Sequence, residues 1–445
     1  MIDLEVGMAT LLIFGTLMGI LALGVPFSFA IGGTAILYTY LLWGEGGLNV
    51  VATQTLGLMH STVLLALPMF YLMATLLQRS GIADALYELM YAVMGRVKGG
   101  LCAGTVLICM VFAAMAGISG AATVSMALIA LPSMLKRGYD KRIAIGAIAS
   151  GGALGILIPP SVTMIVYGVL AEVSVGRLFA GGILPGVLLG SLFIAYILIR
   201  SHFQPQLGPA IPQEERVPFR QVVPRFRALI LPLFLVLAVL GAIFSGAATP
   251  TEAAAVGALG AICCAAINRS LSWPFLNYCC RETLRLTAMV LWIAMSATWF
   301  SSLYAAVGGS EFINEFIGSL QVSPWVVLIT LQLLLFVLGM IMETNGIIFI
   351  TVPIMVPIIT GLGFDPVWFG VLFIMNMEMG LLTPPFGLNL FYIKGVAPPD
   401  VTMSDIWRSV GPFVLLQAVG LLLCMLFPAL VTAVPDLIYG RPVGR

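Results

Sequence analysis

Two Pro-Pro pairs interrupt long apolar runs of this chain, and the residues around them could form a binding site. One pair ends the segment Gly155–Pro160, and the other ends the segment Gly380–Pro385. Proline lacks a backbone N–H and disfavours the α conformation in the residue before it, so a helix must break at each pair. In lipid, a break persists only where protein or a water-filled cavity surrounds the freed backbone groups. We therefore expect two broken helices whose free carbonyl and amide groups bind a ligand.

The two breaks belong to a repeat with a constant offset of 225 residues. Ser119 falls opposite Thr344 at this offset, so hydroxyl groups recur at related positions. Such an ungapped series of matches indicates an inverted-repeat transporter. Seven residues are identical in the two copies: Pro132 and Pro357, Gly138 and Gly363, Asp140 and Asp365, Gly155 and Gly380, Pro159 and Pro384, Pro160 and Pro385, and Tyr167 and Tyr392.

Four short interruptions hold most of the polar residues that could bind a ligand. Hydroxyl and unwound carbonyl groups at half-helix ends supply the hard oxygen ligands that a dehydrated sodium ion needs, while half-helix N-termini favour an anion. The alternative is that Gly and Ser only allow close helix packing and that Pro produces kinks. Recurrence in both halves favours a binding site. The interruptions are Gly117–Gly120, Pro159–Ser161, Glu343–Gly346, and Thr383–Pro385 with Gly387 and Asn389.

Two carboxylates, Glu343 and Glu378, and two amides, Asn376 and Asn389, also lie within apolar runs. Ionisable groups at membrane depth are costly and usually functional. For the carboxylates, ion binding or proton relay and a hydrogen-bonded structural role are equal alternatives. No Lys or Arg lies in the interior of a predicted span. We therefore expect helix ends, hydroxyls, amides and bound cations to hold the charge of an anionic substrate.

The composition indicates a polytopic helical membrane protein. Apolar side chains make up 60% and charged side chains 9% of the 445 residues, whereas soluble proteins carry about 25% charged residues. The two histidines and seven cysteines lack metal-ligand or catalytic spacing, and no basic stripe indicates nucleic acid, so we expect neither an enzyme nor a nucleic-acid-binding protein. At about 20 residues a span, the first-half runs are 7–23, 26–43, 61–78, the pair 99–117 and 121–135, the broken run 143–172, and 178–200. The second-half runs are 228–246, 251–268, 286–304, the pair 325–342 and 346–361, the broken run 366–396, and 409–434.

A polar, Pro- and Arg-rich linker over 201–227 divides the chain into halves of the same plan. Lys and Arg collect in cytoplasmic loops, and their distribution indicates that the second half is inverted relative to the first, although Arg441 and Arg445 do not fit this orientation. The segments Arg79–Lys98 and Ser270–Arg285 mix apolar and basic residues, and we interpret them as corresponding amphipathic arms. The predicted domains are 1–98 (scaffold spans and arm), 99–176 (hairpin and broken helix), 177–227 (span and linker), 228–304 (scaffold spans and arm), 305–397 (hairpin and broken helix) and 398–445 (last span).

Over nearly its full length the chain resembles the DctM-like large membrane subunit of tripartite ATP-independent periplasmic (TRAP) transporters. The motifs that carry the resemblance are RSGIADALYELM from Arg79, GGL from Gly99, GISG from Gly117, IPPSVTMIVYG from Ile158, LFAGGILPG from Leu178, GAATPTEAAAVGAL from Gly246, and FDPVWFGVLFIMNMEMGLLTPPFGLNLF from Phe364.

The resemblance implies an all-α, elevator-type secondary transporter in the bacterial cytoplasmic (inner) membrane, with two hairpins and two broken helices. It implies uptake of a small organic anion, a carboxylate or a sugar acid such as sialic acid, driven by sodium ions. It also implies two partners, a small four-helix membrane subunit and a periplasmic substrate-binding protein. A stand-alone sodium- or proton-coupled carboxylate symporter of related fold is the alternative.

The residues and the resemblance together give a set of predicted site residues. In this chain Ala121 and Ser125 stand where the family commonly has a serine and an aspartate, and Glu343 replaces an aspartate. The number of bound cations could therefore differ from that of the family. The predicted cation ligands are Ser119, Gly120, Gly155, Pro159, Ser161, Glu343, Thr344, Asn345, Gly380 and Thr383, and the predicted substrate contacts are Ser161, Asn376, Pro385 and Asn389.

Overall fold

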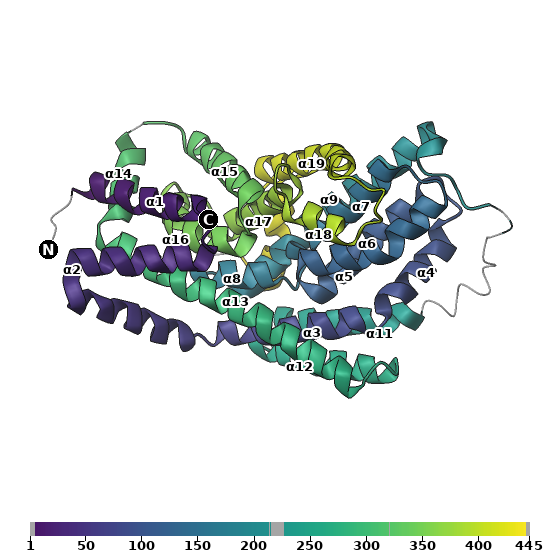
Figure 1. Cartoon of the computed structure of the whole chain (residues 1–445), viewed down its shortest axis with the longest axis horizontal. Coiled ribbons are helices and arrows are strands. Elements are labelled where there is room, and N and C mark those ends of the chain that lie inside the picture. Colours follow the sequence, from purple (N-terminus) through teal and green to yellow (C-terminus); the bar gives the residue numbers. More distant parts are fainter. Residues whose placement is uncertain (1–4, 213, 215–226, 320, 442–445) are drawn as a thin grey trace.

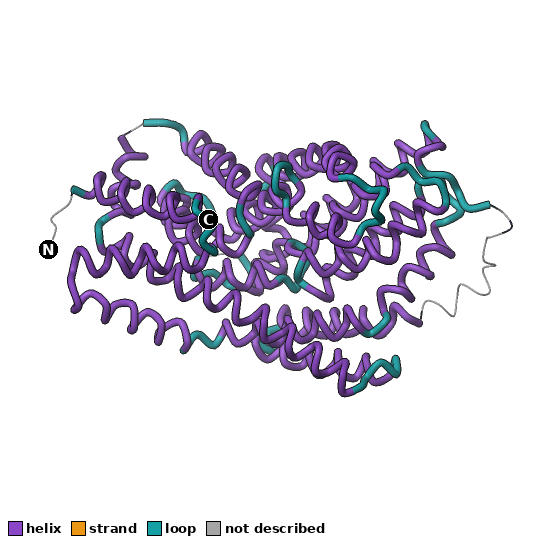
Figure 2. The backbone as a smooth tube through the Cα atoms, viewed as in Figure 1, coloured by secondary structure: helices purple, strands orange, loops and turns teal. Residues whose placement is uncertain are grey.

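The computed structural model describes residues 5–212, 214, 227–319 and 321–441. These residues form helices joined by short turns, with no strand among them (Figure 2). Residues 213 and 215–226 of the predicted linker over 201–227 lie outside the described residues, and so does Arg445. The prediction of an all-α protein is confirmed.

Eight helices in the described part of the chain are long and apolar enough to cross a membrane. A ninth candidate is the pair Val63–Arg79 and Ile82–Met94, which bends by 56° at the break between the two helices. The multi-pass membrane protein expected from composition is therefore confirmed. The eight helices are α2 (Phe27–Met59), α6 (Ser119–Lys136), α9 (Val175–Phe203), α12 (Pro250–Ile267), α13 (Trp273–Ala306), α15 (Pro324–Ile341), α16 (Thr344–Gly361) and α19 (Met403–Leu426).

Each half contains one hairpin and one broken helix, as the sequence predicts. In the first half, α5 (Gly100–Ala116) and α6 form the hairpin, and α7 (Lys141–Ala153) ends in the short helix η2 (Leu154–Ile156) before α8 (Val162–Leu170). In the second half, α15 and α16 form the hairpin, and α17 (Pro366–Leu382) is separated from α18 (Leu388–Val396). The peptide bonds Pro159–Pro160 and Pro384–Pro385 lie in the two breaks and are both cis.

Long helices form a layer along one side of these hairpins and breaks (Figure 1). Helix α2 packs along α13, and α12 packs along α3 (Ala66–Arg79). Helix α12 starts with a capping box in which Thr249 Oγ1 and Glu252 each bind the backbone N–H of the other, as the motif Thr-Pro-Thr-Glu predicts. The remaining helices are α1 (Val6–Ala22), α4 (Ile82–Met94), α11 (Arg227–Phe244), α14 (Gly309–Ser319) and α20 (Ala429–Tyr439).

The pairing of the two amphipathic arms was predicted wrongly. Helix α2 bends at Gly44, whose φ is +66°, and continues to Met59. At the offset of 225, Gly44 corresponds to Arg269, which also has a positive φ of +55°. The segment 45–59 therefore corresponds to the start of α13, and α4 corresponds to α14. The spans predicted at 26–43 and 61–78 leave 45–59 unassigned, and the motif GEGG at 44–47 interrupts the apolar run there.

The last predicted run, 409–434, is two helices rather than one. Helix α19 ends at Leu426, and α20 begins at Ala429 after Phe427 and Pro428. Proline after a helix end is common because it cannot continue the helix. Both helices pack against α9 and α17.

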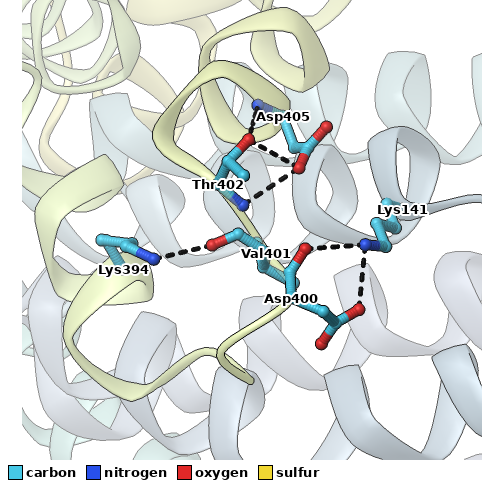
Figure 3. A network of polar contacts seen from close by, with 6 residues as sticks. All are labelled: Lys141, Lys394, Asp400, Val401, Thr402 and Asp405. Atoms are coloured by element: carbon cyan, nitrogen blue, oxygen red, sulfur yellow. Dashed lines mark hydrogen bonds and ion pairs between the residues drawn. The ribbon is translucent and has the colours of Figure 1, made fainter.

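A polar network fixes the connection between α18 and α19 (Figure 3). Lys141 of α7 contacts the carboxylate of Asp400 at 2.9 Å and donates to the Asp400 carbonyl at 2.8 Å. Lys394 donates to the carbonyl of Val401 at 2.7 Å, while Thr402 and Asp405 form the capping box of α19. The Lys141 hydrogen bond lowers the pKa of Asp400. The network therefore joins the broken helix of the first half to the loop that follows the broken helix of the second.

Candidate functional site

Residues of the two hairpin turns, Gly117–Gly120 and Glu343–Asn345, meet around one small cavity of about 70 Å³. Its wall combines both hairpin turns, the start of α8 and the start of α18, together with a residue of α3. Segments more than 200 residues apart in sequence therefore form one site. The lining residues are Tyr71, Gly117, Ile118, Ser119, Gly120, Ile156, Val162, Thr163, Glu343, Thr344, Asn345, Leu381, Leu388 and Tyr392.

The turn of the first hairpin sits directly in the first broken helix. Gly117 ends α5 with φ of +63°, a conformation that glycine adopts without strain, and its carbonyl accepts a hydrogen bond from the Val162 N–H at 3.3 Å. A Cβ on Gly117 would lie 2.7 Å from the Pro160 carbonyl oxygen, and a Cβ on Gly155 would lie 2.8 Å from that of Ile118. These two glycines let the backbones of the turn and of the break approach each other at the cavity.

Ser119 connects the first half to the second at the cavity. Its hydroxyl donates to Asn389 Oδ1 at 3.0 Å, and both side chains are buried. Next to it, a Cβ on Gly120 would lie 2.9 Å from the ring of Tyr392. The start of α6 and the start of α18 are thus in close contact, which brings both predicted substrate-contact and cation-ligand residues to the same place.

Ser161 has a different local role. It is fully buried and caps α8, because its Oγ accepts from the Met164 N–H at 3.2 Å. The same hydroxyl donates to the Ile156 carbonyl at 2.5 Å across the break. The side chain of Ser161 therefore holds the two parts of the broken helix together beside the cavity, whereas Thr163 lines it.

Glu343 caps α16 at the turn of the second hairpin. One carboxylate oxygen, Oε2, accepts from the Gly346 N–H at 3.2 Å, and the other, Oε1, accepts from Asn345 Nδ2 at 2.7 Å. The Asn345 carbonyl oxygen, Oδ1, is buried without a hydrogen-bond partner. Because an amide oxygen without a donor is costly to bury, this atom is available to a cation or to a donor group of a substrate.

Four helices begin at the cavity: α6 at Ser119, α8 at Val162, α16 at Thr344 and α18 at Leu388. The first N–H groups of a helix have no partner inside the helix, and the helix N-terminus carries a partial positive charge. Such ends bind anions. The cavity thus combines positive helix ends with hydroxyl, carbonyl and carboxylate oxygens, which suits an anion and a cation bound side by side.

Histidine, cysteine and clustered acidic residues contribute little to this site. The described residues contain no group of three or more His, Cys, Asp or Glu side chains that could hold a metal ion. A cation at the cavity would have to be held by neutral oxygens together with the single carboxylate of Glu343. This donor set fits a hard monovalent ion such as sodium better than a transition metal, which prefers nitrogen or sulfur ligands.

Several predicted site residues lie away from the cavity wall. Gly380 packs against Gly339, since a Cβ on Gly380 would lie 2.7 Å from the Gly339 backbone. Thr383 Oγ1 donates to its own helix at the carbonyl of Met379, at 2.7 Å. Asn376 donates to Gln332 of α15 at 2.6 Å. Close packing therefore accounts for Gly380, and a hydrogen bond within its own helix accounts for the Thr383 side chain. The Asn376 amide nitrogen bonds to α15, whereas its Oδ1 is buried without a hydrogen-bond partner.

Pro385, Pro159 and Glu378 also lie outside the cavity wall. Pro385 is exposed, and Pro159 lines an apolar crevice on the other side of its break. Glu378 is fully buried, and neither of its carboxylate oxygens has a hydrogen-bond partner. It is the only Asp, Glu, Lys, Arg or His among the fully described residues that is buried, and it does not line the cavity.

The sequence analysis missed Tyr71 and Thr163 as cavity residues and identified Tyr392 only as a repeat match. Tyr71 belongs to α3 in the layer of long helices, so nothing in its own segment indicates that it reaches the hairpin turns. Thr163 follows Ser161 by two residues and could have been found from the position of the break. Tyr392 carried a signal, because it matches Tyr167 in the other half.

Comparisons with known proteins identify relatives of the whole chain. The family model "Tripartite ATP-independent periplasmic transporter, DctM component" matches residues 14–430. The C4-dicarboxylate TRAP transporter large permease protein DctM of Vibrio cholerae serotype O1 is 33% identical and aligns with 98% of this chain and 99% of its own length. The sialic acid TRAP transporter large permease protein SiaM of the same organism is 30% identical over 96% of this chain and 98% of its own length.

A solved structure has the same fold despite low sequence identity. The Alcanivorax borkumensis YdaH transporter matches with a TM-score of 0.65 over 91% of this chain and 98% of its own, at 14% identity. At this identity the match concerns the fold alone.

Proposed function

Because the chain belongs to the family of DctM components of tripartite ATP-independent periplasmic transporters, we propose that it imports a small organic anion together with sodium ions. The substrate is a carboxylate or a sugar acid. This class includes the C4-dicarboxylates and sialic acid after which its relatives are named.

The observation that carries the proposal is the convergence of the N-termini of α6, α8, α16 and α18 on one cavity. Among the described residues no lysine or arginine lines this cavity, so the helix ends supply the positive potential for an anionic substrate. Glu343 and the unpartnered Asn345 oxygen supply negative potential beside it. A substrate anion and a sodium ion bound together would balance each other's charge, which supports coupled transport.

We further propose that the hairpins and broken helices move as one body against the layer formed by α2, α3, α12 and α13. Contacts between the two halves support a single moving body, because Ser119 bonds to Asn389 and Lys141 bonds to Asp400. The body also contacts the layer, for example through the bond from Gln78 of α3 to Ser125 of α6, and such contacts would have to break during the movement. Movement of the body across the membrane would carry the cavity from one face to the other, as in an elevator.

The matching family is described as tripartite and periplasmic, which supports partners that deliver the substrate to this chain. We propose that a periplasmic binding protein supplies the substrate and that a small membrane subunit binds the layer of long helices. The stand-alone symporter remains the competing function, and the experiment must separate the two.

Transport by the reconstituted chain tests the proposal. The chain and its small membrane subunit are placed in proteoliposomes, and uptake of labelled C4-dicarboxylates and sialic acid is followed with and without the cognate binding protein. We expect uptake only with both an inward sodium gradient and the binding protein. Uptake without the binding protein would establish the stand-alone symporter instead, and dependence on a proton gradient would contradict sodium coupling.

A further inference from the structure

Two apolar crevices separate the hairpins from the outer helices α11 and α1. The α11 crevice has a volume of about 530 Å³ and lies between α11, α5 and α9; the α1 crevice has a volume of about 400 Å³ and lies between α1, α14 and the second hairpin. Helices α1 and α11 correspond to each other at the offset of 225 residues, as do α5 and α15. Both halves therefore have a crevice between the same type of outer helix and the first helix of the hairpin.

The walls of both crevices are apolar. The α11 crevice is lined by aliphatic, methionine and phenylalanine side chains with one glycine and one proline. The one hydroxyl at the α1 crevice, that of Thr351, donates to the carbonyl of Ile347 at 2.7 Å within its own helix. A dry cavity of roughly 150 Å³ lined by such side chains excludes water and takes up apolar ligands. These larger crevices accordingly need apolar matter to fill them.

The crevices open to the outside of the protein at membrane depth. Leu237 of α11 is 60% exposed and Val187 of α9 is 49% exposed, although both line the α11 crevice. Met18 and Leu334 at the α1 crevice are 49% and 47% exposed. Since these helices lie in apolar segments of a membrane protein, their exposed sides face lipid hydrocarbon.

Each crevice reaches the back of one interrupted segment. The α11 crevice ends at Ile158 and Pro159 in the first broken helix, and the α1 crevice ends at Met342, directly before Glu343. The freed backbone groups at such interruptions are stable only where protein or a water-filled cavity surrounds them, and the residues that line the crevices at these points are apolar. Whatever fills the crevices therefore contacts residues next to the interruptions that border the binding cavity.

We propose that the acyl chain of a bilayer phospholipid occupies each crevice and seals the hairpin against the outer helix. Acyl chains are the apolar ligand that the bilayer supplies in quantity. An acyl chain is also flexible enough to stay in contact with the hairpin while the hairpin moves. This proposal goes beyond the transport function and holds for any substrate.

Photolabelling tests the proposal in the intact chain. The protein is reconstituted into nanodiscs that contain phosphatidylcholine with a photoactivatable diazirine in the middle of one acyl chain, and labelled peptides are mapped by mass spectrometry. We expect labels on residues 107–114 of α5, which lie behind α11. In the variant Gly241→Phe, a phenyl ring should enter the α11 crevice, because nothing lies within 4 Å of a Cβ built on Gly241. Labelling of α5 should then fall several-fold.

Gly57→Phe is the matched control. Gly57 is also an exposed helical glycine with nothing within 4 Å of an added Cβ, but it lies on α2 and lines neither crevice. Its substitution should leave α5 labelling unchanged. Val187→Trp fills the same crevice from α9 and replaces Gly241→Phe if that variant does not fold. Unlabelled α5 in the wild type, or labelling that neither filling variant reduces, would overturn the proposal without bearing on transport.

Discussion

Ser119 and Asn389 are the residues through which the two halves of the chain meet at the cavity. Their hydrogen bond of 3.0 Å is buried on both sides, so its loss leaves the Asn389 oxygen without that donor. An unsatisfied buried acceptor costs about 1–3 kcal/mol. The hydroxyl of Ser119 therefore has a structural role whatever its contact with a cation.

We expect Ser119→Ala to lower the midpoint of thermal unfolding in detergent and to reduce uptake. Ser150→Ala is the control, because Ser150 is equally buried but donates to the carbonyl of Gly146 in its own helix. That carbonyl keeps its helical partner in the variant, so the control should lose less stability. Equal losses in the two variants would show that the Asn389 contact contributes nothing particular.

The two carboxylates in apolar runs have opposite surroundings, and this separates their roles. Glu343 accepts two hydrogen bonds and lines the cavity, whereas Glu378 has no partner and does not line it. An opposite charge at 4 Å is worth about 4 kcal/mol at an effective dielectric constant of about 20. The proposed sodium ion would therefore depend on the charge of Glu343.

We expect Glu343→Gln to raise the sodium concentration for half-maximal uptake by about tenfold or more, since about 1.4 kcal/mol already corresponds to tenfold. Glu378→Gln makes the same chemical change away from the cavity and should leave this concentration unchanged. Sodium titrations of uptake in proteoliposomes measure both. A normal sodium dependence in Glu343→Gln would remove this residue from the cation site.

The sequence identified the interruptions at the residue scale but could not assign every residue to a role. Pro and Gly mark a break through local backbone chemistry, and this signal survives in any tertiary context. Gly380 and Asn376 carry the same signal as true cavity residues, yet they serve the packing of α15 against α17. The face that a side chain takes in a buried helix depends on its neighbours, which sequence alone does not place.

At the scale of elements, the hairpin turn and the broken helix of the first half form one unit. A Cβ on Gly155 would lie 2.8 Å from the Ile118 carbonyl oxygen, which is closer than real side chains approach. Overpacking of this kind costs about 1–3 kcal/mol. The turn would have to move out of the break to accommodate a methyl group.

We expect Gly155→Ala to lower thermal stability and to slow uptake, because it displaces the turn that carries Ser119. Gly33→Ala is the control on α2, where nothing lies within 4 Å of an added Cβ. It should be neutral or stabilise by up to about 1 kcal/mol, because alanine loses less backbone entropy than glycine in a helix. Differential scanning fluorimetry of the purified variants makes the comparison. If Gly155→Ala were as stable and active as Gly33→Ala, the turn would not be tightly seated in the break.

The hairpins and broken helices could be predicted from sequence, whereas the arms could not. The former carry Pro-Pro pairs, glycines and a repeat without gaps. The arm at 45–59 begins with GEGG, a composition typical of a loop, and its counterpart 270–285 continues into α13 without interruption. The two copies of the arm thus differ in sequence, and only the second copy is continuous with the span that follows it. The 225-residue offset and the shared positive φ of Gly44 and Arg269 identify them as equivalents.

At the scale of the whole molecule, the hairpins and broken helices (the hairpin body) form bonds among themselves and separate bonds to the layer of α2, α3, α12 and α13. Lys141 and Asp400 join the two halves of the body at 2.9 Å, and the ion pair is present above the lowered pKa of Asp400 and lost as the pH falls through that pKa. Gln78 of α3 instead donates to Ser125 Oγ at 3.2 Å and to the Ala121 carbonyl at 3.3 Å, which joins the body to the layer.

We expect two crosslinks to have opposite effects on uptake. In a background without the seven native cysteines, a short thiol-reactive crosslinker between Lys141→Cys and Asp400→Cys should preserve uptake, because both residues move together. The same reagent between Gln78→Cys and Ser125→Cys should abolish it, and cleavage of a reducible linker should restore it. Uptake that continues with the second crosslink intact would exclude movement of the hairpin body along α3.

The bond between Ser119 and Asn389 also sets a condition on the biogenesis of this protein. Its partners are 270 residues apart, so the ribosome finishes the first hairpin long before the residue that completes it. Until α18 is made, the buried hydroxyl at the start of α6 and the surface of Gly120 that meets Tyr392 have no native partner. A chain truncated before α18 holds every residue of the first break and still lacks a finished site, so it is a substrate for membrane quality control rather than a transporter of half capacity.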